Sequence, residues 1–316
     1  MLAGMARYLK NLLPSEIPAG YSVNPMFTKI ESEETIRNGV FAFRGFIDQL
    51  YDLLIADGEQ YEKPNAKNLQ RPPSLAVDTP FIYHVRSVLL NLGYHSRVSG
   101  DSLTFCGLKT LTPIICCEGM EATSKISAPR LMECLRFLSG CGIYFEGIDL
   151  DAAKPVITHD EWIEATYPDN PALLTGLKIM AVAQRDLRWK TNDEIFLRCD
   201  YRALSNDKTN AADALKDFIS PFSSEIQEFI LYLHQKSILA GLKCTVKIGL
   251  KNSFHYAHKK NAVWELSSSF ADGYRLSVKD AKGSGVSLDD SFLDNSREFE
   301  GWIDMALFKR MEREGK

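Results

Sequence analysis

The chain has 316 residues, of which 45% are apolar and 25% are charged, and this composition is ordinary for a folded globular protein of about two domains. The formal net charge of −4 comes from 37 basic and 41 acidic residues, which argues against a general nucleic-acid-binding protein because such proteins usually carry a basic excess. The sequence lacks the run of about 18 apolar residues that a membrane span needs, and its N-terminus lacks the organisation of a signal peptide, so we expect a cytoplasmic protein without membrane contact.

The first part of the chain predicts two helices and then a polar excursion. A short helix precedes Pro14, and apolar residues at spacings of three and four predict a second helix over about residues 41–56, ending near Gly58. Residues 58–74 are polar and contain prolines. We expect them to form a surface excursion or linker, with a lid over a site as the alternative.

Four later segments each predict a helix followed by a strand. The helices begin at a side-chain cap, and three of them are followed by a glycine, such as Gly93, that accommodates the left-handed backbone of a helix end. The helices are expected over residues 80–92, 128–138, 171–183 and 225–239, and their strands over residues 94–98, 143–148, 195–202 and 242–248. Two more strands are expected over residues 102–106 and 111–117.

A change in composition at residues 205–213 divides the chain into a predicted N-terminal domain, 1–210, and a C-terminal domain, 211–316. In the second domain, strands over residues 253–257, 262–267 and 274–279 are joined by turn-forming sequences, which predicts an antiparallel meander. An amphipathic helix is expected over residues 295–310. We therefore predict an α+β fold of two domains, each with a mixed or antiparallel sheet packed against helices.

The predicted strand over residues 195–202 carries the first candidate site. Side chains alternate along a strand, so Arg198, Asp200 and Arg202 would share one face. The guanidinium groups of Arg198 and Arg202 on this face can bind an anion, because each offers a planar fork to a carboxylate or phosphate. The alternative is a solvated face on which Asp200 pairs with both arginines.

The start of the preceding helix completes this candidate ligand site. Asn170 precedes Pro171, and this order is typical of a helix start, where the Asn side chain accepts from free N–H groups and the proline loses no hydrogen bond. We therefore assign Asp169 and Asn170 to the predicted ligand-binding set.

A second candidate site lies in the C-terminal meander. Trp264 is expected on one strand, and Tyr274 and Arg275 on the next. Lys243 and Lys247 would share a face of the strand that precedes the meander. A sheet face with these side chains could bind a ligand or single-stranded nucleic acid by stacking and charge. The alternative places Trp264 and Tyr274 in the core under the last helix.

The sequence contains no motif that predicts a cofactor or a metal. It has no dinucleotide glycine fingerprint after a strand, no phosphate loop and no Gly-x-Ser-x-Gly elbow. The cysteines have poor metal spacing, and His255 and His258 could share a metal only if a turn separates them. We expect no cofactor, and the odd number of cysteines, seven, fits free and mostly buried thiols in a reducing compartment.

Several segments resemble a family of uncharacterised two-domain bacterial proteins of similar length, over about residues 75–300. The segments are residues 132–138, 147–150, 167–171, 196–202, 233–244 and 264–275. Relatives often carry a longer cysteine-bearing insert before the position of Val286, where this chain has only residues 282–285. The resemblance implies a domain plan and no chemistry, and it does not carry a metal role to this chain.

Two functional classes stay open. The first is a non-catalytic protein that binds a small anionic ligand or a protein partner, which follows from the absence of a catalytic signature. The second is a hydrolase or transferase in the cleft between the domains, which would use Glu146, Asp149 or a cysteine with His84 or His95. The oligomeric state is also open.

Overall fold

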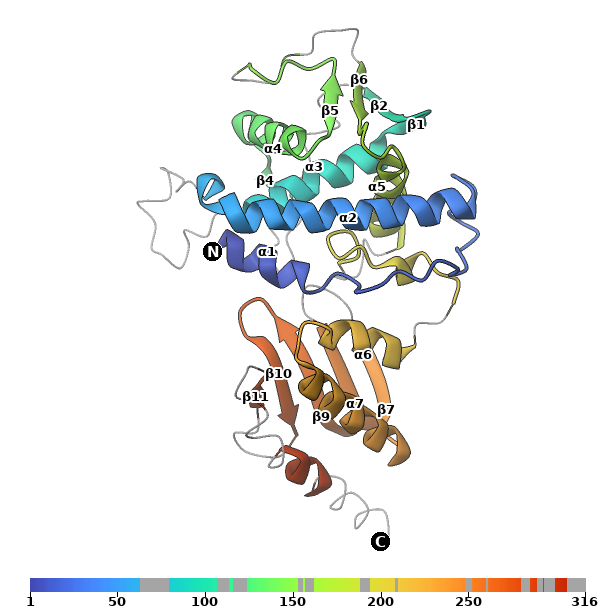
Figure 1. Ribbon diagram of the computed structural model, residues 1–316, viewed down its shortest axis with the longest axis vertical. Coiled ribbons are helices and arrows are strands. Elements are labelled where there is room, and N and C mark those ends of the chain that lie inside the picture. The colour runs from blue at the N-terminus through green and yellow to red at the C-terminus, as the bar shows by residue number, and fades with distance from the viewer. Residues whose placement is uncertain are drawn as a thin grey trace. The chain divides into compact units, whose positions relative to one another are not determined.

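The structure is a computed structural model, and it divides into two compact units. Unit 1 comprises Met1–Leu13 and Ile17–Asp207, and unit 2 comprises Pro14–Glu16 and Lys208–Lys316. The residues that the structure describes are 1–62, 80–106, 114–115, 124–152, 156, 162–187, 194–207, 210–247, 252–259, 261–279, 285–288, 292 and 299–305. Each unit combines helices with an antiparallel sheet, which confirms the predicted α+β class (Figure 1).

The helices of unit 1 form its largest packed layer. They are α1 (Leu2–Lys10), α2 (Glu33–Asp57), α3 (Phe81–His95), α4 (Ala128–Gly140) and α5 (Ala172–Val182), with a 3₁₀ turn η1 (Gly58–Tyr61) and a π turn η4 (Ala183–Leu187). Helix α2 begins earlier than predicted, because the Ser32 side chain accepts a hydrogen bond from the Thr35 N–H and caps it. Its buried side chains, including Phe43 and Ile47, face α1 and α5.

The predicted role of Gly93 is wrong. The sequence predicts that this glycine ends the first of the four helices that precede a strand, but α3 continues to His95. A Cβ atom on Gly93 would lie 2.6 Å from the Leu177 carbonyl oxygen of α5, so no larger residue fits where these helices cross. This glycine therefore serves close packing of two helices rather than a left-handed turn.

A four-stranded antiparallel sheet lies beside these helices. Its order is β1-β2-β6-β5, formed by β1 (Arg97–Ser99), β2 (Ser102–Cys106), β6 (Trp162–Thr166) and β5 (Tyr144–Glu146). Alternate residues of β2 and β6, such as Phe105 and Ile163, are buried. A separate ladder pairs β3 (Ile114–Ile115) with β4 (Ser124–Lys125). Strand β6 has no counterpart among the predicted strands, and most of the predicted polar excursion and Cys116 and Cys117 lie outside the described residues.

The predicted strand over residues 195–202 is wrong. Residues 196–199 form a turn, and Tyr201–Ala203 form a short 3₁₀ helix, η5. Cys199 has a φ of 49°, a left-handed value that a regular strand does not contain. This correction removes the sheet face on which the first candidate site depended.

Unit 2 is a five-stranded antiparallel sheet with helices on one side. Helices α6 (Ala211–Ile219) and α7 (Ser224–Leu239) precede the sheet, and residues 299–305 are helical. The strands are β7 (Lys243–Lys247), β8 (Asn252–His258), β9 (Asn261–Ser269), β10 (Gly273–Val278) and β11 (Gly285–Ser287), in the spatial order β11-β10-β9-β8-β7. The predicted meander is confirmed, and Gly241, with a φ of 77°, follows α7 as expected.

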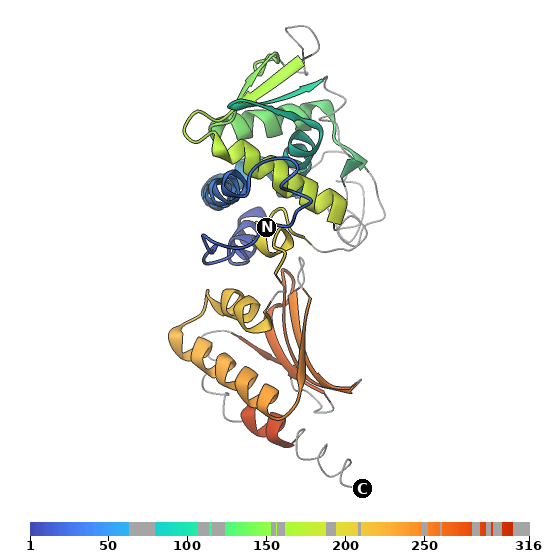
Figure 2. The ribbon, with the colours of Figure 1, turned by 90° about the vertical axis from the view of Figure 1, so that its right-hand side faces the viewer.

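One face of this sheet and the helices enclose the core of unit 2. Phe254, Tyr256, Trp264 and Leu266 are buried there against α6 and α7. Figure 2 shows these helices on one side of the sheet, and no described element of unit 2 covers the other side. Within the described part of the chain, no helix has both the length and the apolar character that crossing a membrane requires.

Candidate functional site

The first predicted site lies in the packed interior of unit 1. Arg198 and Asp200 are only 7% and 5% exposed. Arg202 Nη1 lies 3.2 Å from Asp200 Oδ1, and its guanidinium lies over the Tyr201 ring at 5.0 Å. Asp200 also accepts a hydrogen bond from the Arg202 N–H and so caps η5. These residues therefore do not form an open row on a sheet, and Asp200 already neutralises one of the two arginines.

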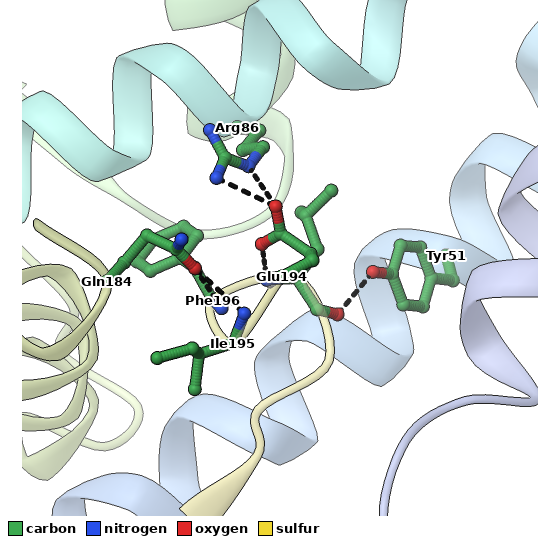
Figure 3. Close-up of polar contacts among 7 residues, drawn as sticks. Tyr51, Arg86, Gln184, Glu194, Ile195 and Phe196 are labelled. Carbon is green, nitrogen blue, oxygen red and sulfur yellow. Dashed lines mark hydrogen bonds and ion pairs between the residues drawn. The ribbon is translucent and has the colours of Figure 1, made fainter. Parts of the chain in front are cut away.

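Side-chain acceptors explain why residues 194–200 turn instead of extending (Figure 3). The Gln184 side-chain oxygen accepts from the N–H groups of Ile195 and Phe196 at 2.8 and 3.0 Å. Glu194 Oε1 accepts from the Leu197 N–H at 2.8 Å, and the Tyr51 hydroxyl donates to the Leu197 carbonyl. These backbone groups are satisfied by side chains, so they have no need of a neighbouring strand.

A buried ion pair holds this turn against α3. Glu194 Oε2 lies 2.8 Å from Arg86 Nε and 2.7 Å from Arg86 Nη2, and both side chains are almost fully buried. The two-pronged contact satisfies one carboxylate oxygen while the other oxygen caps the turn. Each charge here has a structural partner, so the cluster stabilises unit 1 and does not present a charge to solvent.

The start of α5 differs from its predicted form. Pro171 occupies the cap position, and no side chain there makes a capping hydrogen bond. Asn170 contributes its backbone carbonyl, which accepts from the Leu173 N–H at 3.0 Å. Asp169 and Asn170 are exposed on the surface of unit 1. The predicted Asn170 side-chain cap is therefore wrong.

Of the carboxylates proposed for catalysis, Glu146 is the last residue of β5, and Asp149 lies in the turn after it. Asp149 Oδ1 accepts from the Asp151 N–H at 2.9 Å, as expected for a turn, and Glu146 lies opposite Glu164 of β6. Partial desolvation and the charges of Arg185 and Lys178 lower the pKa of His95. Asp149 therefore lies in an exposed turn.

The buried thiols are poor nucleophiles. Burial raises the pKa of Cys134, Cys199 and Cys141, the last to about 12, so these side chains stay as thiols at neutral pH. Among the described residues, no group of three or more His, Cys, Asp and Glu side chains is placed to hold a metal ion.

The second predicted site is divided between the two faces of the unit 2 sheet. Trp264 is 1% exposed, stacks on Tyr256 at 3.8 Å, and donates from its indole N–H to Ser237 Oγ at 2.9 Å. Tyr274 contacts Phe218 on the same core side. Arg275 is exposed on the opposite side, because successive strand residues alternate. The expectation that Trp264 and Arg275 share a face is wrong.

The side of the sheet away from the helices, which we call the open face, is polar. Strand alternation and register place on it Lys243, Thr245 and Lys247 of β7, Ser253 and His255 of β8, Glu265 and Ser267 of β9, and Arg275 and Ser277 of β10. All of these side chains are exposed or half-buried. The open face thus carries three permanent cations and one carboxylate.

One row of the open face carries two cations, Lys247 and Arg275, and continues past Arg275 to Ser287 of β11. The register pairs Lys247 with Ser253, Ser253 with Ser267, and Ser267 with Arg275. Neighbouring strands are about 4.8 Å apart, so the stretch from Lys247 to Arg275 spans roughly 14 Å of backbone. In the part of the chain that the structure describes, neither Lys247 nor Arg275 forms an ion pair, and both charges face solvent.

Contacts join three side chains, Ser253 of this row and His255 and Glu265 of the neighbouring row. Ser253 Oγ lies 2.8 Å from His255 Nε2, and His255 Nδ1 lies 3.3 Å from Glu265 Oε2. The side chains of His255 and Glu265 are 30% and 35% exposed, so solutes can reach them. A hydroxyl, an imidazole and a carboxylate in this order are the parts of a nucleophile, its base and the group that orients the base.

A β-bulge creates this contact, which explains why the sequence did not reveal it. Ala257 pairs with Ala262, but Tyr256 pairs with Trp264, so Val263 is an extra residue in β9. Continuing the Ala257 register without the bulge would place Trp264 opposite His255. The spacing Ser-x-His on a strand is the only local signal, and it does not identify the residue on the next strand.

Comparison with known proteins gives no match to this chain among protein-family models, curated proteins or solved structures. The family resemblance therefore remains a prediction, and it assigns no role to any residue. The function has to be argued from the open face itself.

Proposed function

We propose that the chain binds a small ligand that carries a carboxylate or a phosphate group, and that the ligand lies on the open face of unit 2. The observation that carries this proposal is the row in which two serine hydroxyls lie between Lys247 and Arg275. Both cations lack an internal counter-ion among the described residues. The side chains available to a ligand are therefore those that an anion needs.

The residue types in this row match anion recognition. Arginine offers a planar fork that binds two oxygens of a carboxylate or phosphate, and lysine supplies a point charge on a long flexible stem. The hydroxyl of Ser267 donates a hydrogen bond between these charges. An oxyanion above this stretch of the row would receive donors from both sides and from below.

The charge on the open face favours an anion over a cation. Lys243 lies on the same face as Lys247 and Arg275, and Glu265 is its only carboxylate within the described sheet residues. That carboxylate already lies 3.3 Å from His255 Nδ1. A cationic ligand would be repelled by the positive charges of Lys243, Lys247 and Arg275.

A single-stranded nucleic acid is a weaker candidate for this face. Such ligands are held by a basic groove together with aromatic side chains on which bases stack. Trp264 and Tyr274 supply no such platform, because both face the helices. The net charge of −4 points the same way.

The competing location for an anion site is the first predicted site in unit 1, which comprises Arg198, Asp200, Arg202, Asp169 and Asn170. Arg198 and Asp200 are buried, and Asp200 lies 3.2 Å from Arg202, which reduces the charge available to a ligand. Arg275 is the member of the predicted set that is both exposed and without an internal carboxylate partner among the described residues. The open face is therefore the better-supported location.

Calorimetric titration of the full chain with inorganic phosphate and with succinate tests the proposal. We expect Lys247→Ala and Arg275→Ala each to weaken binding at least about tenfold, since hydrogen bonds to charged groups contribute about 1.5–3 kcal/mol. Lys216→Ala, which removes an exposed cation on α6, is the matched control and should bind like the parent chain. Unchanged affinity in the Lys247 and Arg275 variants, with loss in Arg198→Ala plus Arg202→Ala, would move the site to unit 1.

A further inference from the structure

We propose that Ser253 is a nucleophile, activated by His255 and assisted by Glu265, and that the open face hydrolyses esters that carry a negatively charged group. The preference for an anionic ester rests on the proposed function. The activation of Ser253 rests on its own contacts and does not require that preference.

The distances suit proton transfer from the hydroxyl. Ser253 Oγ lies 2.8 Å from His255 Nε2, which is within hydrogen-bond reach of a nucleophile and its base. The two residues are separated by one position on β8, so both side chains point to the open face. The rigid strand therefore holds the hydroxyl and the ring together before any ligand binds.

Glu265 determines which ring nitrogen carries the proton. Its Oε2 atom lies 3.3 Å from His255 Nδ1, and a carboxylate at this position favours a proton on Nδ1. Nε2 then has a free lone pair directed at Ser253. When Nε2 takes the serine proton, the ring becomes positively charged, and the carboxylate stabilises that charge.

The β-bulge fixes Glu265 in this position. The extra residue Val263 moves Glu265, instead of Trp264, opposite His255. Trp264 is held on the core side by its stack on Tyr256 and its hydrogen bond to Ser237. The register of the three side chains is therefore fixed by the core of unit 2, and bulges elsewhere are known to aim side chains at sites.

The reaction conserves atoms and charge at each step. Ser253 Oγ bonds to the ester carbonyl carbon while its proton passes to His255 Nε2, and the carbonyl electron pair moves to the oxygen. The intermediate then reforms the carbonyl and breaks its bond to the alkoxy oxygen, which takes the proton from Nε2 and leaves as the alcohol. Water repeats these two steps on the acyl-serine and releases the acid.

The neighbours of Ser253 on both sides supply donors for the developing negative charge. Lys247 is its register partner on β7 and Ser267 is its partner on β9. An ammonium group and a hydroxyl in these positions can stabilise the oxyanion of the intermediate. Arg275, one strand further, would bind the charged end of the substrate.

Labelling of the full chain with an alkyl fluorophosphonate, followed by mass spectrometry of the peptides, tests the inference. We expect an adduct on Ser253 that is absent in Ser253→Ala and that forms at least about 100-fold more slowly in His255→Asn. Ser99→Ala removes an exposed strand serine of unit 1 and should leave the label unchanged. An unlabelled chain, an adduct on another residue, or an unaltered rate in His255→Asn would overturn the inference.

Steady-state kinetics with 4-nitrophenyl succinate and 4-nitrophenyl acetate test the role of Glu265 and the charge preference. Because Glu265 acts through His255, Glu265→Gln should lower kcat and leave KM nearly unchanged, and a change confined to KM would contradict this role. Binding of phosphate or succinate without labelling of Ser253 would leave the proposed function standing and overturn this inference. Labelling of Ser253 with equal kcat/KM for both esters would support its activation and contradict the anion preference.

Discussion

Gly39 of α2 lies against Gly176 of α5, and a Cβ atom on Gly39 would be 2.7 Å from the Gly176 backbone nitrogen. Real side chains do not approach a backbone this closely, so the two helices touch through their glycines. This crossing places α5 beside the long helix of unit 1, and the π turn that holds Gln184 continues from the end of α5.

Replacing Gly39 by alanine should destabilise unit 1 by about 1–3 kcal/mol, because the extra methyl group overpacks the crossing. Gly45→Ala is the matched control in the same helix, since its Cβ would meet no atom within 4 Å. That variant should gain about 0.5–1 kcal/mol from the better helix propensity of alanine. Urea unfolding measures both, and equal effects of the two variants would contradict the packing account.

Trp264→Ala should destabilise unit 2 by about 3–5 kcal/mol, because it leaves a large cavity beneath the sheet and removes the partner of Ser237. Trp162 provides the comparison, since it is 52% exposed on β6. Its replacement by alanine should change the free energy of unfolding by less than about 0.5 kcal/mol. A small effect of Trp264→Ala would mean that the indole is not buried as described.

The Arg86–Glu194 pair gives a prediction for the turn at residues 194–200. Glu194→Gln should cost about 3–5 kcal/mol, because it removes the carboxylate charge that lies against the buried Arg86 guanidinium. Glu33→Gln, which breaks the exposed pair with Arg37, should cost less than about 1 kcal/mol. The comparison uses urea unfolding at neutral pH, and similar costs for the two variants would show that the Arg86–Glu194 pair is solvated.

His234 predicts how the stability of unit 2 depends on pH. Its Nδ1 lies 2.8 Å from the Tyr256 hydroxyl, and burial lowers the pKa of this side chain. Below pH of about 6.5, the unfolded chain gains a proton on this residue that the folded chain does not bind. The free energy of unfolding should therefore fall as the pH drops from 6.5 toward the lower folded pKa.

His234→Gln should weaken this dependence, because glutamine does not titrate. Urea unfolding of both chains at pH 7 and pH 5 gives the comparison. If the free energy of unfolding falls by the same amount in the variant, His234 does not cause the pH dependence.

The helices and the unit 2 meander could be predicted because their signals are local. Apolar spacing locates α2, and cap residues with following glycines locate α4 and α7. The tight turns between β8, β9 and β10 follow from short turn-forming sequences. The fold class follows from these elements without any information on tertiary contacts.

The errors come from contacts between residues that are distant in the chain. The Gln184 side chain accepts from the N–H groups of Ile195 and Phe196, and Tyr51 donates to the Leu197 carbonyl, which turns a segment whose alternation predicts a strand. Gly93 reads as a helix end, but it is required by contact with Leu177. Neither effect is visible in a window of neighbouring residues.

The candidate site depends on a register that one inserted residue changes. Arg275 and the lysines of β7 could be selected from charge and alternation, and Arg275 belongs to the predicted set. Ser253 and Glu265 could not, because only the bulge at Val263 brings Glu265 opposite His255. The sequence presents His255 as a surface histidine or, with His258, as a metal ligand.

The most direct test of the account is to map bound anions onto the chain by nuclear magnetic resonance. The isotopically labelled full chain is titrated with inorganic phosphate and separately with succinate, and backbone amide shifts are followed. We predict that the largest changes fall on Lys247, Ser253, Ser267 and Arg275, in saturating curves that are lost in the Lys247→Ala plus Arg275→Ala chain. Saturating changes confined to residues 198–202, or no saturating change on the open face, would contradict it.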